Sequence, residues 1–188
     1  MDMREQILTS AQRLVQQRGF NGFSYADIAE EVGIRKPSLH HHFPSKVDLG
    51  MALIENYTSQ LEKELHRISV LPITTDAKLA AYIALYRAAL DADCMCLGGM
   101  LASDAITLDA AILPGLKRFF AMNIEWLTEV LAEGKSLQHF DLSGPVADHA
   151  RMLLSALQGA LMIARATGDV AAFDQTTALL LGNFTRKG

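Results

Sequence analysis

The 188-residue chain is poor in three features that often decide the class of a protein: it has two cysteines, no long apolar run and little net charge. Two cysteines cannot form the disulfide framework of a small secreted domain. The longest apolar-biased stretch, residues 152–164, is too short to cross a bilayer as a helix. The first residues are polar and contain no signal-peptide core. We therefore expect a cytoplasmic protein without a membrane-spanning segment.

The formal net charge is −4, so overall charge does not indicate binding to nucleic acid. The local distribution is more informative. Residues 1–50 contain six Lys or Arg and six Asp or Glu, but residues 33–47 contain three cations and no acid. Half of the positions are apolar, which is enough for one small and one larger domain.

Residues 24–46, SYADIAEEVGIRKPSLHHHFPSK, predict a helix, a glycine turn and a second short helix. Ser24 is a natural N-cap, and Asp27 follows three positions later as in a capping box. Gly33 suits a left-handed turn, and Pro37 falls in the first turn of the second helix, where its missing N–H costs nothing. This is the layout of a helix-turn-helix, whose second helix enters the major groove of DNA. The alternative is an ordinary helical hairpin with a solvated basic face.

A wider stretch resembles a known family. Residues 4–57, REQILTSAQRLVQQRGFNGFSYADIAEEVGIRKPSLHHHFPSKVDLGMALIENY, closely resemble the N-terminal domain of the TetR family of bacterial transcriptional repressors. The similarity includes a first helix that ends in RGF, the IAEEVGI segment and the HFPSK exit into the next helix. One departure is His40, which stands where the family usually has a phosphate-contacting Tyr. Histidine can still donate a hydrogen bond to a phosphate.

The resemblance implies DNA contacts at particular positions. Three consecutive histidines within this stretch do not predict a metal site, because neighbouring helical positions point about 100° apart. At the start of the second helix, the implied phosphate contacts are Ser24 and Tyr25. In the major groove, bases or phosphates would be contacted by Arg35, Lys36 and Ser38. The flanking DNA backbone would be contacted by His40, His41 and Lys46.

The pattern past residue 57 is helical throughout, and no segment alternates convincingly as a strand does. We expect an all-α chain of about nine helices. Residues 1–47 would form a three-helix helix-turn-helix domain, and residues 48–188 a helical effector-binding and dimerisation domain. The helices expected after the first three cover residues 46–69, 76–92, 97–106 and 112–134, a segment that begins near residue 145, and residues 171–186.

Small residues on the last two helices allow another helix to approach closely. Two such helices from each of two subunits would form a four-helix interface, and TetR-family members generally dimerise there. The alternative is that these helices only close the core of one chain. A homodimer would place two recognition helices about 34–36 Å apart, or somewhat more, on a palindromic operator in double-stranded DNA. The expected interface residues are Ser155, Ala156, Gly159, Ala160, Ala178, Leu179, Leu181 and Gly182.

A mostly apolar cavity with a few polar groups is expected among the fifth to eighth helices, where a small-molecule effector would bind. No charged cluster indicates a charged ligand, so the pattern favours an apolar or aromatic compound. Each candidate residue also suits a purely structural place in the core. The candidates are Tyr82, Tyr86, Cys96, Met100, Phe119, Phe120, Asn123, Trp126, Gln158 and Met162.

Cys94 and Cys96 are the only cysteines. A zinc site would need two further ligands at suitable spacing, and a disulfide between residues two apart would be strained. One interpretation is that both cysteines are small side chains that only fill space in the core. However, CLGGMLASD is similar to the segment that opens the sixth helix in a TetR subgroup with a cysteine at the position of Cys96, which responds to electrophiles and oxidants. The resemblance implies that Cys96 is a sensor.

The family resemblance implies a regulator, most simply a repressor, in which effector binding tilts the fourth helix and moves the recognition helices out of register with DNA. No cofactor or metal is expected. Two other classes stay open. One is a DNA-bound scaffold whose helical domain binds another protein. The other is an enzyme that uses the helical cavity, although the sequence shows no nucleophile and base pair, phosphate loop or metal-ligand spacing.

Overall fold

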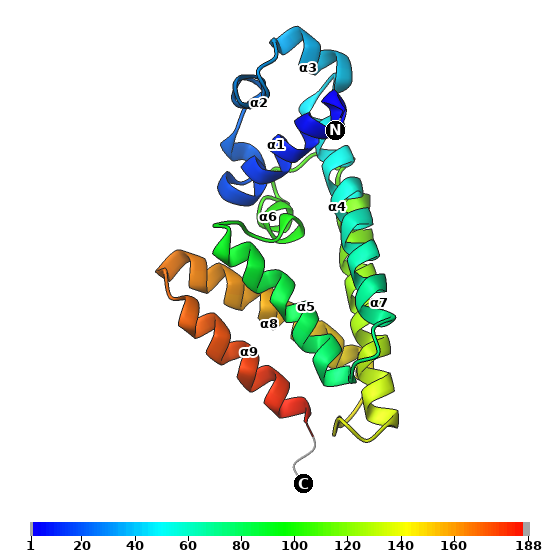
Figure 1. Ribbon diagram of the computed structural model, residues 1–188. Coiled ribbons are helices and arrows are strands. Elements are labelled where there is room, and N and C mark those ends of the chain that lie inside the picture. Colours follow the sequence, from blue (N-terminus) through cyan, green and yellow to red (C-terminus); the bar gives the residue numbers. More distant parts are fainter. Residues whose placement is uncertain (1, 186–188) are drawn as a thin grey trace. The chain divides into compact units, whose positions relative to one another are not determined.

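The computed structural model describes residues 2–185, and its regular secondary structure in this range consists of helices joined by turns and loops (Figure 1). Its only strand-like pairing among these residues is one isolated bridge between Phe140 and Thr185. The all-α prediction is therefore confirmed. The helices are α1 (Met3–Arg18), the 3-10 turn η1 (Phe20–Gly22), α2 (Tyr25–Val32), α3 (Lys36–His42), α4 (Lys46–Ser69), α5 (Thr75–Asp91), α6 (Leu97–Ser103), α7 (Leu113–Ser136), α8 (Val146–Thr167) and α9 (Val170–Phe184).

The chain divides into two compact units. The first contains the residues up to Gln60 together with Cys94–Phe119, and the second contains Leu61–Asp93 and the described residues from Phe120 onward. The chain passes between the units within α4, at the turn after α5, and within α7. The two units are defined by which residues pack together. They do not test the predicted boundary between a DNA-binding domain that ends at residue 47 and an effector-binding domain that begins at residue 48.

The first unit is built around α1, whose buried face packs against the helix-turn-helix. Asp2 caps α1 in a reciprocal capping box with Glu5. Ile7, Ile28 and Leu39, from the first three helices, are fully buried. Burying large aliphatic side chains of this kind stabilises a fold by about 1.5–3 kcal/mol each.

Helix α6 lies in the same unit and approaches α7 closely through a glycine. A Cβ added at Gly98 would lie 2.2 Å from the ring of Phe119, so only glycine permits this contact. The sequence predicted that this helix would reach residue 106, but it ends at Ser103. Short turns replace it, since Thr107 N–H donates to the Asp104 carbonyl at 2.9 Å, and Ile106 is fully exposed.

The second unit packs α5, α8 and α9 with the later part of α7. Leu79, Leu127, Leu157 and Phe173 contribute fully or almost fully buried side chains from four different helices. α9 was expected to extend to Arg186, which lies outside the described residues, and the observed helix ends at Phe184. No described helix is long and apolar enough to cross a membrane.

Candidate nucleic-acid interface

The helix-turn-helix forms through the local signals that its sequence contains. Ser24 caps α2 by accepting from Ala26 N–H at 3.2 Å, and Asp27 accepts from Ser24 N–H at 2.7 Å. Gly33 ends the helix with φ of 74° in the left-handed region. Pro37 occupies the first turn of α3. The predicted cap, turn and second helix are therefore present, and the short turn fixes α3 against α2.

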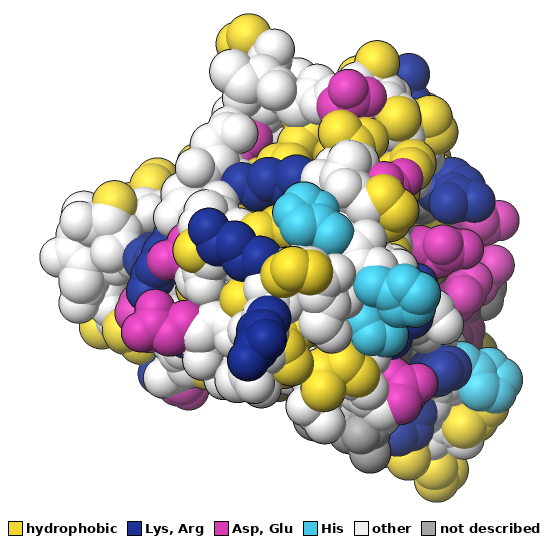
Figure 2. All heavy atoms as spheres, turned by 90° about the horizontal axis from the view of Figure 1, so that it is seen from above, with side chains coloured by type: hydrophobic (Ala, Val, Ile, Leu, Met, Phe, Trp, Pro, Cys, Tyr) yellow, Lys and Arg dark blue, Asp and Glu magenta, His cyan; other side chains and the backbone are white. Residues whose placement is uncertain are grey.

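The outward side of α3 is basic. Leu39 is fully buried and anchors the helix, which leaves the remaining side chains free to face solvent. In a view onto this end of the chain, histidine side chains lie close to several Lys and Arg side chains near the middle of the face (Figure 2). The exposed members of the predicted DNA-contact set are Ser24, Arg35, Lys36, Ser38, His40 and His41.

Ser24 is exposed, but its hydroxyl is already engaged. It donates to Asp27 Oδ2 at 2.6 Å while it accepts from Ala26 N–H. The hydrogen bonds that the Ser24 hydroxyl and the Ser24 N–H donate to Asp27 hold the pKa of its carboxyl below its usual value. A phosphate contact from the Ser24 hydroxyl would require it to turn away from Asp27.

Tyr25 has an internal role that the sequence did not indicate. Its hydroxyl lies 2.6 Å from the Ser45 carbonyl and 3.0 Å from the Phe43 carbonyl, to which it donates. Burial, together with the nearby charge of Asp48, raises the pKa of Tyr25 to about 12. Tyr25 therefore fixes the turn between α3 and α4 to the start of α2.

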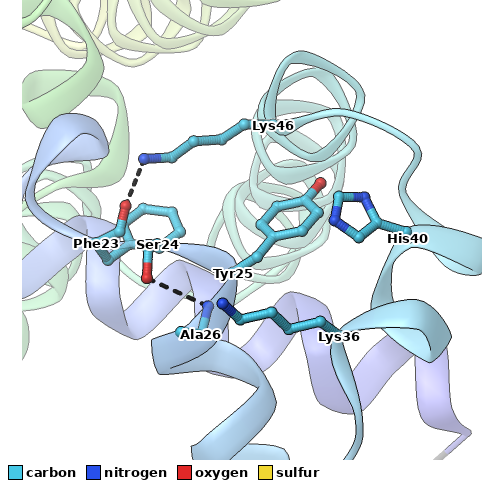
Figure 3. Close-up of a pocket in the computed structure, with 7 residues that line it drawn as sticks. All are labelled: Phe23, Ser24, Tyr25, Ala26, Lys36, His40 and Lys46. Atoms are coloured by element: carbon cyan, nitrogen blue, oxygen red, sulfur yellow. Dashed lines mark hydrogen bonds between the residues drawn. The ribbon is translucent and has the colours of Figure 1, made fainter.

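Lys46 is half-buried and also bonds within the chain. Its ammonium donates to the Phe23 carbonyl at 2.5 Å and lies 4.3 Å from the centre of the Phe23 ring (Figure 3). Burial lowers the pKa of Lys46, while Asp104 and Asp27 act in the opposite direction. Lys46 thus holds the start of α4 against the segment that leads into α2.

His40 lies beside Tyr25, with ring centres 4.8 Å apart (Figure 3). Its Nδ1 lies 3.2 Å from the Pro44 carbonyl oxygen. A carbonyl only accepts, so Nδ1 must carry the proton in this contact. The neutral ring then presents Nε2 as an acceptor, and only the protonated ring can donate through Nε2.

A pocket of about 400 Å³ opens between these elements. Its lining is polar or cationic except for Phe23 and Ala26, and no carboxylate contributes to it. Lysine, serine and tyrosine side chains and backbone N–H groups are among the donors that bind phosphates in DNA complexes. The pocket therefore has the chemistry of a phosphate site. The lining residues are Phe23, Ser24, Tyr25, Ala26, Lys36, His40 and Lys46.

Acidic residues of the first unit are neutralised near the recognition helix. Glu31 pairs with Arg13 at 2.5 Å, which joins α2 to α1 and lowers the pKa of Glu31. Asp27 lies 3.8 Å from Arg18. Because these carboxylates pair with α1, they oppose an approaching phosphate less than free carboxylates would.

The structure brings part of the predicted effector set together in the second unit. Tyr82 donates to Asn123 Oδ1 at 2.7 Å, and its hydroxyl lies 3.2 Å from that of Tyr86. Gln158 Nε2 donates to the Tyr86 hydroxyl at 3.4 Å. Trp126 stacks on Tyr82 with ring centres 5.4 Å apart. One orientation satisfies the whole chain of hydrogen bonds, running from Gln158 through Tyr86 and Tyr82 to Asn123.

Other members of the effector set lie elsewhere. Cys96, Met100 and Phe119 belong to the first unit. The Met100 methyl group would lie 3.6 Å from a Cβ added at Gly19, which places it beside the end of α1. Phe120 is half-buried. Met162 is 47% exposed on α8, which corrects the expectation that it lines an interior cavity.

Cys96 precedes α6 and is 5% exposed, whereas Cys94 is half-buried. The Tyr57 hydroxyl lies 4.0 Å from Cys96 Sγ. Neither cysteine is in a disulfide. The sequence suggested a reactive thiol at a helix start, but α6 has only seven residues and the thiol is shielded from solvent.

The predicted interface residues on α8 and α9 are all exposed or half-buried. A Cβ added at Gly159 or Gly182 would meet nothing within 4 Å, so packing within the chain does not require glycine at either position. Leu179 of α9 is 70% exposed. Ser155, Ala178 and Gly182 are exposed, and Ala156, Gly159, Ala160 and Leu181 are half-buried.

Several contributors to the site were missed from the sequence. Ser45 and Asp48 cap α4 as Ser24 and Asp27 cap α2, with Ser45 N–H donating to Asp48 Oδ2 at 3.0 Å. The repeated Ser-x-x-Asp spacing could have indicated it. The Phe23 carbonyl that holds Lys46 left no signal, because its partner lies 23 positions away.

A three-helix head with a capped second helix and a basic, outward-facing third helix defines a helix-turn-helix DNA-binding protein. Residues 7–53 match the family described as "Bacterial regulatory proteins, tetR family". A solved transcriptional regulator of this family from Agrobacterium tumefaciens is 34% identical, with 97% of each chain covered and a TM-score of 0.93. The chain belongs to the TetR family of bacterial transcriptional regulators, and it is a DNA-binding transcriptional regulator.

Two further relatives extend the comparison. A TetR transcriptional regulator from Legionella pneumophila is 31% identical over 98% of each chain, with a TM-score of 0.91. The transcriptional repressor NemR from Escherichia coli K12 is 23% identical over 87% of this chain and 84% of its own length. The reduced form of E. coli NemR has the same fold, with a TM-score of 0.84.

Proposed function

We propose that the protein is a cytoplasmic repressor that binds a palindromic operator as a homodimer and leaves it when a small-molecule or electrophilic effector binds. The observation that carries the DNA-binding part is the outward face of α3, where Arg35 and Lys36 are exposed beside the carboxylate-free pocket. NemR, a relative over most of the chain, is named as a repressor. Repression, rather than activation, is inferred from that similarity.

The proposed DNA contacts follow from exposure. Arg35, Lys36 and Ser38 would contact bases or phosphates in the major groove, and His41 the flanking backbone. His40 would hold a phosphate in the pocket. Tyr25 and Lys46 would mainly hold the pocket in shape, because their polar atoms donate to backbone carbonyls. Any phosphate contact would come from the parts of these side chains that line the pocket.

The proposed dimer uses the open face of α8 and α9. Glycines without intramolecular neighbours and exposed aliphatic side chains on one face are what close approach of a second copy requires. A two-fold dimer presents two α3 helices to successive major grooves. This explains how a chain with a formal net charge of −4 would gain affinity from a small basic surface.

The proposed effector site includes the hydrogen-bonded chain around Tyr82. Its aromatic walls and neutral hydrogen-bonding groups suit an apolar or aromatic compound with one or two polar atoms. Effector binding would favour a conformer in which α4 tilts and the two α3 helices no longer fit the operator. The coupling free energy needed is modest, about 1–3 kcal/mol.

Cys96 is the proposed electrophile sensor. Because its thiol is buried, a reagent would reach it only when the segment around α6 opens. We expect Cys96→Ser to abolish operator release by a quinone or by hypochlorite, while Cys94→Ser, the matched control, keeps it. Unchanged release in Cys96→Ser would eliminate the sensor.

The proposed function is tested by selecting fragments of the source genome with the purified full-length protein and sequencing them. We expect enrichment of one or a few palindromic sites near genes that the protein controls, with binding that weakens strongly as salt rises. Enrichment without any common sequence would contradict an operator-specific regulator.

A further inference from the structure

The chain passes from the second unit to the first between Asp93 and Cys94, and its backbone is unusual at that point. Asp93 has φ of 52°, in the left-handed region that non-glycine residues seldom adopt. Its carboxylate pairs with Arg165 of α8 at 3.4 Å. We call residues 93–96 the strap. The strap is thus tied at its first residue to a helix of the second unit.

The other end of the strap is tied to α1. Met95 N–H donates to the Gln16 carbonyl at 3.0 Å, and Gln16 Nε2 donates to the Met95 carbonyl at 2.8 Å. Met95 is 4% exposed. Both backbone polar groups of one buried strap residue are therefore satisfied by a single glutamine of the DNA-binding head.

The segment that follows the strap holds the next part of the head. Asp104, directly after α6, accepts from Phe20 N–H at 2.8 Å, and Asn21 Nδ2 donates to the Thr107 hydroxyl at 2.8 Å. Phe20 and Asn21 form the turn that leads to Phe23, whose carbonyl holds Lys46 at the DNA pocket. Hydrogen bonds thus hold the segment after α6 to the turn that leads to the pocket.

We propose that the strap is a conformational coupling element, in which Gln16 and Asp104 are positioning residues for the DNA-binding helices. This inference rests on the proposed function. Displacing the strap by one residue would break both Gln16 hydrogen bonds at once and release the end of α1. The strap contains both cysteines, so a thiol adduct there would act on the same contacts.

The left-handed residue allows a sharp test. Asp93→Gly and Asp93→Val both remove the ion pair with Arg165, but only valine resists a positive φ. Gln138 is the other non-glycine residue with positive φ among those described, at 60°, and it lies between α7 and α8. Gln138→Val is therefore a matched control for backbone strain away from the strap.

Two readouts are measured on the full-length protein: amide hydrogen exchange in residues 16–23, and affinity for the genome-selected operator. We expect Asp93→Val to raise exchange in residues 16–23 and weaken operator binding by about ten-fold, because the strap loses its register. Asp93→Gly and Gln138→Val should change affinity by less than about three-fold. The larger effect of valine follows from the strain of a β-branched residue at a positive φ.

A second pair of variants tests the α1 end. Gln16→Glu replaces the donor to Met95 with an acceptor of the same shape and should reproduce the Asp93→Val exchange pattern. Gln12→Glu, one turn earlier on α1, should leave amide exchange in residues 16–23 as in wild type. The proposal is overturned if Asp93→Val and Gln138→Val give the same exchange in residues 16–23, or if Gln16→Glu matches wild type. If the wild-type protein selects no operator, the proposed function fails. The exchange measurement still shows whether the strap positions residues 16–23.

Discussion

At the residue scale, the predicted DNA-contact set separates into side chains that face solvent and side chains that organise the site. Arg35 and Lys36 are exposed and can reach DNA. Tyr25 and Lys46 bond to carbonyls of neighbouring segments instead. This division means that removing an organising side chain alters the shape of the site, whereas removing an exposed one deletes a contact.

His40 gives a prediction about one phosphate contact. Its Nδ1 donates to the Pro44 carbonyl, so Nε2 is the ring atom that can face a phosphate in the pocket that Lys36 and Lys46 also line. We expect His40→Ala to weaken binding to the genome-selected operator by about three- to ten-fold at constant pH and salt, because the pocket loses one hydrogen-bonding side chain.

His40→Tyr carries the residue that the family usually has at this position and should bind within about three-fold of wild type. His66→Ala, at an exposed position of α4, is the matched control and should bind as wild type does. A His40→Ala protein with wild-type affinity would rule out His40 as a phosphate contact.

The residues that could be predicted from the sequence are those whose partners are near in the chain. Ser24, Gly33 and Pro37 act through capping, turn geometry and the missing proline N–H, which are local effects. Tyr25 and Lys46 bond to carbonyls 18–23 positions away, and a backbone carbonyl has no sequence signature. Their internal roles required the fold.

At the element scale, α2 and α4 begin with the same reciprocal arrangement of serine and aspartate. The caps satisfy first-turn amides and place a carboxylate at the positive end of each helix. The end of α6 shows the limit of local signals. Helical spacing continues to Ile106, but the Asp104 contact with Phe20 favours a turn instead.

The α2 cap yields a stability prediction. Ser24→Ala removes the acceptor for Ala26 N–H and should lower the melting temperature by about 2–4 °C. The hydrogen bonds from Ser24 lower the pKa of Asp27 in the folded protein, so their stabilisation is present at neutral pH and is lost as the pH falls through that lowered pKa.

Thermal unfolding at neutral and acidic pH measures this effect. The difference between Ser24→Ala and wild type should shrink in acid, and Ser38→Ala, which removes an exposed hydroxyl from α3, should match wild type. A difference that grows on acidification would show that Asp27 is not stabilised in its charged form.

At the scale of the whole molecule, a small basic face on a chain of net negative charge gains affinity by being duplicated. The open glycine face of α8 and α9 offers the means. The small residues of α8 and α9 predicted this face from the sequence. Only the structure distinguishes glycines at which a Cβ would meet nothing from glycines at which a Cβ would clash with a neighbouring side chain. Gly98, against Phe119, is of the second kind.

Gly159→Leu tests the dimer. A Cβ at this position meets nothing within 4 Å in the chain, and leucine favours a helix by about 0.8 kcal/mol over glycine, so we expect the protomer to fold at least as well. The dimer should dissociate at least about ten-fold more readily, because a methylene-sized clash at a helix interface costs about 1–3 kcal/mol. Light scattering over a dilution series measures the change.

The matched control is Ala121→Leu, an enlargement at an exposed position of α7. It should leave the dimer intact. A Gly159→Leu protein that stays dimeric at the same dilution as wild type would place the interface elsewhere.

Whether α3 reads the operator is decided by the operator affinity of a protein carrying Arg35→Ala and Lys36→Ala. The control carries Lys117→Ala and Arg118→Ala, an adjacent exposed basic pair on α7. We predict that the α3 variant folds normally but loses at least about 30-fold in affinity and its preference for operator over scrambled DNA. The control should bind as wild type does. An α3 variant that retains wild-type affinity and preference, or a control that loses as much, would show that Arg35 and Lys36 do not read the operator.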